Sequence, residues 1–132
     1  MLCNGPVYWK TKGAAIAATS STESELVGMV KAGNEMIYLL NVMRAIGTIT
    51  DEKRDEVLFA DNTAAITMAH SCACSARTKH LGLLVAKAHH LETEERIKFK
   101  YIETKDQLAD IMTKPVSKGV MIHILPLILK TV

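Results

Sequence analysis

The sequence predicts an α/β domain, and two observations about its apolar residues lead to that class. Segments that are apolar at every second position, or in one short run, alternate with segments that are apolar at every third or fourth position. In addition, the 132 residues are 48% apolar and 23% charged, which fits one globular core and excludes a disordered or fibrous chain. The predicted order is strand, helix, strand, helix, helix, strand, helix.

The first two elements are a strand and a long helix. Apolar and basic side chains alternate from Val7 to Lys12, which predicts a half-buried strand. Ser20 and Glu23 have the spacing of a capping box, so a helix is predicted to start there, with an apolar stripe at three- and four-residue steps. Gly47 is predicted to end it, because glycine often follows a helix C-terminus.

The middle of the chain follows a charged turn. The continuous apolar run from Val57 to Ala60 predicts a central strand buried on both faces. Asn62 to His70 is predicted to be a short helix that leaves this strand. A loop of small residues, Ser71 to Ser75, then leads to a second helix from Lys79 to about Glu92, which is apolar on one side.

The last part of the chain predicts one more strand and one more helix. Arg96 to Ile102 alternates again, with Lys98 and Lys100 on a basic, solvent-facing side. Thr104 to Thr113 is predicted to be a short helix. The apolar tail Val120 to Leu129 is shorter than the ~20 residues that cross a bilayer, so we expect a terminal helix or an edge segment and no membrane partner.

Composition gives limited information about partners and compartment. The formal net charge is +2, so any contact with nucleic acid would have to be local. Three cysteines, Cys3, Cys72 and Cys74, cannot all pair, and the sequence opens without a charged region followed by an apolar one. We therefore expect a reduced, intracellular and cytoplasmic protein.

Three acidic residues stand out by their positions. Asp61 directly follows the apolar strand, at the edge where open α/β sheets bind ligands, although Asp61 or Asn62 could equally cap the next helix. Glu25 lies in the first turn of the long helix, which favours a carboxylate in any case, and it borders the apolar stripe. Asp110 lies beside apolar residues, where an acid needs a partner or a cation. Singly, none of them decides the function.

The segments around these acids form a specific set of motifs. Ser20 to Glu25 reads SSTESE and resembles SSTEAE, Phe59 to Ile66 reads FADNTAAI and resembles CDNQSAI, Arg77 to Leu81 reads RTKHL and resembles RTKHI, and Gln107 to Pro115 reads QLADIMTKP and resembles QLADILTKP. Order and spacing agree from about Asn4 to Lys118. In these motifs the chain resembles the ribonuclease H domain at the C-terminal end of copia-type retrotransposon Pol polyproteins.

This resemblance implies a ribonuclease H-like mixed sheet with flanking helices over residues 1–118, followed by an apolar tail over residues 119–132. The family reaction is hydrolysis of the RNA strand of an RNA–DNA hybrid with two Mg²⁺ or Mn²⁺ ions. The implied catalytic, metal-binding residues are Glu25, Asp61 and Asp110. The implied hybrid-contacting residues are Asn62, Arg77, Lys79 and His80, although a solvated helix start explains the last three equally well. The upstream reverse transcriptase region of the polyprotein is the implied partner.

The sequence departs from the family in two places. The remaining acid of the family lies on a first strand resembling DADWAG, which these residues do not contain, and only Met1 to Gly5 corresponds to the second strand. We therefore expect an unpaired edge on the strand Val57 to Ala60 and impaired activity in the isolated chain. Gly82 to His90 also differs from the aromatic and basic run of the family.

Two alternatives remain open. A non-catalytic remnant or a nucleic-acid-binding module would carry the same motifs. A small zinc-binding protein could use His70, Cys72, Cys74 and His80 as ligands, although their spacing is not that of a familiar zinc finger.

Overall fold

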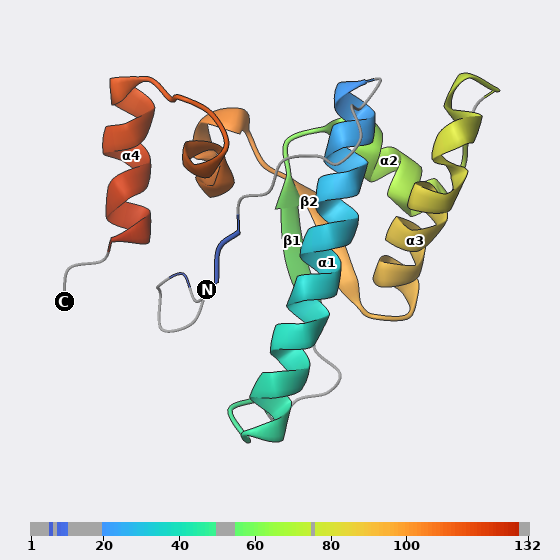
Figure 1. Ribbon diagram of the computed structural model, residues 1–132, viewed down its shortest axis with the longest axis horizontal. Coiled ribbons are helices and arrows are strands. Elements are labelled where there is room, and N and C mark those ends of the chain that lie inside the picture. The colour runs from blue at the N-terminus through green and yellow to red at the C-terminus, as the bar shows by residue number, and fades with distance from the viewer. Residues whose placement is uncertain (1–5, 7, 11–19, 50–54, 75, 130–132) are drawn as a thin grey trace. The chain divides into compact units, whose positions relative to one another are not determined.

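The computed structural model describes residues 6, 8–10, 20–49, 55–74 and 76–129, apart from the side chains of residues 76 and 77. The chain forms two compact units: unit 1 comprises Met1–Ala15 and Ile102–Val132, and unit 2 comprises Ile16–Tyr101. Over the described residues there are four α-helices and a parallel sheet of two strands, which confirms the predicted α/β class (Figure 1). The predicted boundary between residues 118 and 119 stays a prediction.

In unit 2, helix α1 (Ser21–Ala45) starts and ends where the sequence predicts. The Ser20 hydroxyl accepts a hydrogen bond from the backbone N–H of Glu23 at 3.1 Å. At the other end Gly47 has a φ of +73° and donates its N–H to the carbonyl of Arg44 at 3.0 Å. This left-handed cap stops the helix and satisfies one of its last carbonyls.

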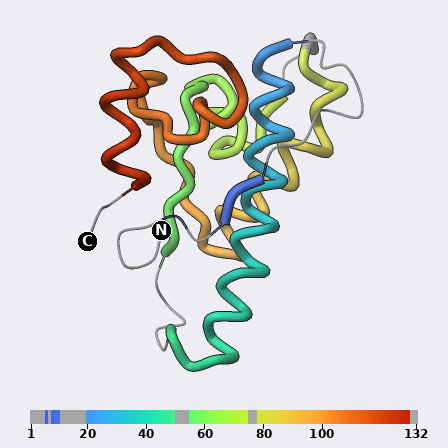
Figure 2. Tube along the Cα trace, turned by 60° about the vertical axis from the view of Figure 1, so that its left-hand side comes forward, coloured from blue at the N-terminus to red at the C-terminus, as the bar shows by residue number. Residues whose placement is uncertain are grey.

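Helix α1, with 25 residues, is longer than the other described helices of unit 2. Its buried residues are Leu26, Met29, Val30, Gly33 and Leu40. The C-terminal part extends past the strands and the other helices of this unit in two views (Figures 1 and 2). Tyr38, Val42 and Ile46 are consequently exposed, at 64%, 41% and 71%.

Strands β1 (Glu56–Ala60) and β2 (Ile97–Tyr101) pair in parallel, with Phe59 opposite Lys100. The prediction that β1 is buried on both faces is wrong, because Phe59 is 51% exposed and only Ala60 is fully buried. Over the described residues β1 pairs with β2 alone, and the unpaired edge expected from the sequence stays a prediction for the whole chain. The buried side chains of the strands point to one face, toward the core.

Two further helices complete the core of unit 2. Helix α2 (Thr63–Ser71) follows β1, and helix α3 (Gly82–Thr93) precedes β2. The predicted helix from Lys79 to about Glu92 is confirmed, although its first residues belong to a 3₁₀-helix, η1 (Ala76–Leu81), that leads into α3. The core contains Leu26, Met29, Val30, Ala60, Ala65, Ile66, Ala69, Leu81, Val85, Ala88, Leu91, Ile97 and Phe99.

In unit 1, the prediction of one helix from Thr104 to Thr113 is wrong. Two short 3₁₀-helices occur instead, η2 (Thr104–Asp106) and η3 (Leu108–Met112), because the backbone is extended at Gln107 between them. The Glu103 carboxylate accepts a hydrogen bond from Lys105 and raises the pKa of this lysine above its usual value.

The tail forms helix α4 (Lys118–Ile128), so the expected terminal helix is confirmed. Tyr8 to Lys10 form no regular structure, and the described part of unit 1 contains no strand that they could pair with. The strand predicted from Val7 to Lys12 is therefore not seen at these positions, and Val7, Thr11 and Lys12 lie outside the described residues. None of the described helices has the length and apolar character needed to cross a membrane.

Candidate functional site

Asp61 lies at the carboxyl end of β1, immediately after the buried Ala60. The helix cap that could have explained its position belongs to its neighbour, since the side-chain oxygen of Asn62 accepts a hydrogen bond from the N–H of Ala65 at 3.1 Å. Of the two residues that the sequence offered as a cap for α2, the structure therefore selects Asn62. Asp61 is half-buried, at the edge of the sheet where α/β folds bind ligands.

Glu25 lies near the start of α1 and is half-buried, directly before the fully buried Leu26. This confirms its predicted place at the border of the apolar stripe. The start of α1 and the carboxyl end of β1 lie at the same, upper end of unit 2 in Figure 1. Glu25, near the start of α1, and Asp61, directly after β1, thus belong to element ends that lie at one end of unit 2 (Figure 1).

Asp110 belongs to unit 1, in the 3₁₀-helix η3. Its side chain is 13% exposed, and the Nζ atom of Lys114 lies 2.7 Å from its Oδ2 atom. The sequence predicted that an acid at this position needs a partner or a cation, and Lys114 is such a partner. Asp110 is therefore an ion-pair residue in the structure, whatever else it binds.

The candidate substrate-contacting residues of unit 2 lie on the 3₁₀-helix η1 or at the start of α2. Lys79 and His80 are exposed on η1, which Leu81, 1% exposed, anchors in the core. Arg77 belongs to the same 3₁₀-helix, and its side chain lies outside the described part. Asn62 is engaged as the cap of α2.

Metal-ligating side chains do not gather in the described part of the chain. Among these residues no three His, Cys, Asp or Glu side chains lie close enough to hold one metal ion. In particular, the four candidate zinc ligands do not form such a group. Cys72 and Cys74 are exposed free cysteines, and the Nδ1 atom of His70 lies 2.5 Å from Oε2 of Glu92 instead.

Sequence reasoning missed two features of unit 2. The His70–Glu92 contact joins residues 22 positions apart, and no local sequence pattern predicts it. An open surface pocket of about 370 Å³ also lies near the C-terminal part of α1. It is lined by Ile37, Leu40, Asn41, Arg44, Glu56, Glu94, Glu95 and Arg96. The apolar stripe of α1 predicts that Ile37 and Leu40 face the core. It does not predict that the polar residues of the lining gather around them.

Comparison with known proteins relates the chain to the Pol polyproteins of retrovirus-related transposons. It is 28% identical over 115 residues to the retrovirus-related Pol polyprotein from transposon TNT 1-94 of Nicotiana tabacum. It is 26% and 25% identical over 113 residues to the corresponding polyproteins from transposons RE1 and RE2 of Arabidopsis thaliana. No family model matches the chain, and no solved structure matches it.

These matches cover 86–87% of the chain. The predicted resemblance to the Pol polyproteins of copia-type retrotransposons is thereby confirmed. The chain spans only about 8% of the length of these curated relatives.

Proposed function

We propose that this chain is the ribonuclease H-like segment of a retrotransposon Pol polyprotein. The reaction we propose for it is metal-dependent hydrolysis of the RNA strand of an RNA–DNA hybrid. Three findings support the proposal: the relatives are Pol polyproteins, the fold is α/β with a parallel strand pair, and the four motifs stand in the family order.

The strongest support for the proposal comes from the positions of Asp61 and Glu25. Asn62 takes the helix-capping role, and its neighbour Asp61 remains half-buried at the carboxyl end of β1, at the same end of unit 2 as the start of α1 with Glu25 (Figure 1). Carboxylates at the ends of separate rigid elements are an arrangement that can bind hard cations.

The chemistry of the three acids suits Mg²⁺ or Mn²⁺, although the described residues hold no group of three metal-ligating side chains. Glu25 and Asp61 offer carboxylate oxygens, which these cations prefer, and Asp110 is the third acid that the family resemblance assigns. When bound, such ions polarise the scissile phosphate and lower the pKa of an attacking water. In this proposal the chain holds the ions and contacts the hybrid backbone. The exposed Lys79 and His80 on η1 are suited to the backbone contacts.

We propose that activity is impaired in the isolated chain. The family resemblance assigns a further acid to a first strand that these residues do not contain, and β1 has an unpaired edge in the described part of the chain. A strand supplied by upstream polyprotein sequence would provide both the missing acid and a partner for this edge.

Cleavage of a labelled RNA–DNA hybrid with Mg²⁺ or Mn²⁺ tests this proposal. Two proteins are compared: the purified chain, and the same chain preceded by the corresponding upstream segment of the Nicotiana tabacum relative. We expect the extended protein to cleave and the isolated chain to cleave weakly or not at all. In the extended protein, Asp61→Asn should reduce the rate by more than the ~10- to 100-fold that loss of an outer-shell metal partner costs.

Glu95→Gln is the matched control, because it removes an exposed carboxylate that belongs to none of the motifs. Circular dichroism on the same samples verifies that each protein is folded. No metal-dependent cleavage by a folded extended protein would contradict the proposed reaction and favour a non-catalytic nucleic-acid-binding module.

A further inference from the structure

The face of the two-stranded sheet that points away from the core of unit 2 combines an exposed aromatic ring with lysines. Side chains of a strand alternate between its two faces, and the core takes Ala60, Ile97 and Phe99. The side chains between these positions point to the opposite face, which we call the sheet face. It consists of Val57, Phe59, Lys98 and Lys100.

The parallel register places these four side chains as two cross-strand pairs. Phe59 lies opposite Lys100, and Val57 lies opposite Lys98. Neighbouring strands are about 4.8 Å apart, so each pair forms one continuous surface. Phe59 is 51% exposed and Lys100 is exposed, whereas Lys98 is half-buried and donates from Nζ to the carbonyl of Glu92 at 3.2 Å.

The charge and the exposed ring of the sheet face indicate which kind of ligand can bind there. The four residues include two lysines and no acid, next to an aromatic ring that is 51% exposed. An apolar protein partner would cover Phe59 only by also burying the ammonium group of Lys100, which is costly without a counter-charge. A polyanion with flat aromatic groups fits both features at once.

We propose that the sheet face binds single-stranded nucleic acid, with one base stacked on Phe59 and backbone phosphates at Lys100 and Lys98. A single strand is required because the bases of a duplex are stacked on each other and offer no free ring face to a side chain. Lys98 can take part despite its contact with Glu92, since an ammonium group has three donors. This binding goes beyond the proposed function, because it uses neither the acids nor a metal ion.

Fluorescence anisotropy of a labelled 12-nucleotide single strand tests the proposal in the presence of EDTA. DNA and RNA strands are used in parallel, and the comparison identifies which sugar is preferred. We expect Phe59→Leu, which keeps an apolar side chain but removes the ring, to weaken binding about 10-fold, while Phe59→Tyr binds like the wild type. Lys100→Gln should reduce the slope of log K against log salt by about 0.7.

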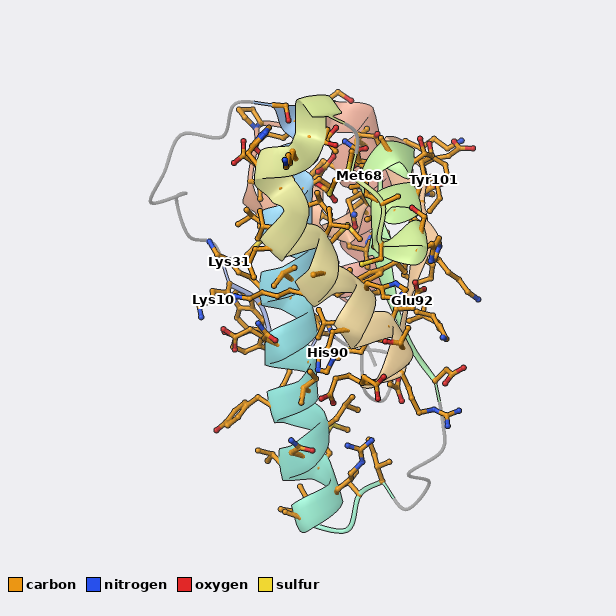
Figure 3. The ribbon with its side chains drawn as sticks, turned by 90° about the vertical axis from the view of Figure 1, so that its right-hand side faces the viewer. Lys10, Lys31, Met68, His90, Glu92 and Tyr101 are labelled. Atoms are coloured by element: carbon orange, nitrogen blue, oxygen red, sulfur yellow. The ribbon has the colours of Figure 1, made fainter. Side chains whose placement is uncertain are left out.

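Matched controls lie elsewhere in unit 2. Tyr38→Leu removes another exposed aromatic ring, from α1, and Lys31→Gln removes an exposed lysine, also from α1. In Figure 3, Lys31 lies on the opposite side of unit 2 from Tyr101, the last residue of β2. Neither control should change the affinity or the salt slope by as much as the sheet-face variants.

Three results would overturn the proposal. One is a folded wild-type chain that binds neither strand at low salt. The second is an equal effect of Phe59→Leu and Tyr38→Leu. The third is a dimer in gel filtration that Phe59→Leu dissociates, which would make the sheet face a self-association surface. Asp61→Asn should bind single strands normally, so that loss of the proposed nuclease and loss of this binding are told apart.

Discussion

The Nδ1 atom of His70 lies 2.5 Å from the Oε2 atom of Glu92 and connects the end of α2 with the end of α3. Glu92 is 8% exposed and points into the protein, while the side chain of His70 is 48% exposed. A second histidine links the same helices, since Nδ1 of His89 lies 2.8 Å from the carbonyl oxygen of Ala69. The packing of α2 against α3 therefore includes polar contacts as well as apolar ones.

The first prediction concerns the energy of this contact. His70→Ala should lower the free energy of unfolding by about 1–3 kcal/mol, because it removes a hydrogen-bond partner of a buried carboxylate. Combined with Glu92→Gln, the two changes should be non-additive, with a coupling energy of about 1 kcal/mol. Urea denaturation of the four proteins in the double-mutant cycle measures it.

The control cycle replaces Glu92→Gln by Glu95→Gln, which changes an exposed acid of the same segment. These two changes should be additive with His70→Ala. Additivity in both cycles would show that the His70–Glu92 contact contributes nothing measurable to stability.

The second prediction compares two glycines of α1. A Cβ atom at Gly33 would lie 2.5 Å from Cδ1 of the buried Leu91, whereas a Cβ atom at Gly28 would meet nothing within 4 Å. Gly28→Ala should stabilise the protein by about 0.5–1 kcal/mol, since alanine is the better helix former. Gly33→Ala should destabilise it, because overpacking costs about 1–3 kcal/mol and exceeds the same gain.

Thermal unfolding of both variants measures the difference, and each glycine is the control for the other. Equal stabilisation by the two changes would show that Leu91 moves aside at little cost and that Gly33 is not required for the approach of α1 to α3.

The third prediction separates the two roles of Asn62. If the residue acts only as the cap of α2, Asn62→Ala should cost about 1 kcal/mol of stability, and Asn62→Asp should cost almost nothing, since both Asn and Asp are good caps. If Asn62 also contacts the hybrid, Asn62→Asp should weaken hybrid binding by charge repulsion while leaving stability unchanged. Chemical denaturation and hybrid binding are therefore measured on the same two variants.

Local sequence signals predicted those parts of the fold that local interactions determine. Ser20, Gly47 and Asn62 mark the ends of helices, and each acts in the structure through neighbours within four residues. The strand β2 was predicted for the same reason, because alternation is visible in a single segment.

The wrong predictions concern properties that depend on distant parts of the chain. Burial of β1 on both faces requires partners that the run Val57 to Ala60 does not itself specify. A continuous helix over Thr104 to Thr113 fails because a short helix gains little from its own hydrogen bonds and depends on its packing. At the candidate site, the sequence located the acids but could not show that Asn62, and not Asp61, caps α2.

The last prediction concerns competition for Asp110 and rests on the proposed metal-binding role. The Nζ atom of Lys114 lies 2.7 Å from Oδ2 of Asp110, so this ammonium group neutralises the carboxylate that a cation would need. Removing it with Lys114→Gln should raise the affinity for Mg²⁺ about 5-fold, which corresponds to the ~1 kcal/mol of a partly exposed ion pair. Isothermal titration calorimetry measures the affinity without any substrate.

Lys105→Gln is the matched control, since Lys105 pairs with a different carboxylate, that of Glu103, at 2.6 Å. It should leave the Mg²⁺ affinity unchanged, whereas Asp110→Asn should abolish the gain produced by Lys114→Gln. If Lys114→Gln binds Mg²⁺ no better than the wild type, Lys114 does not compete with a cation for Asp110. In that case Asp110 serves unit 1 as an ion-pair residue, and the metal-binding role has to rest on Glu25 and Asp61.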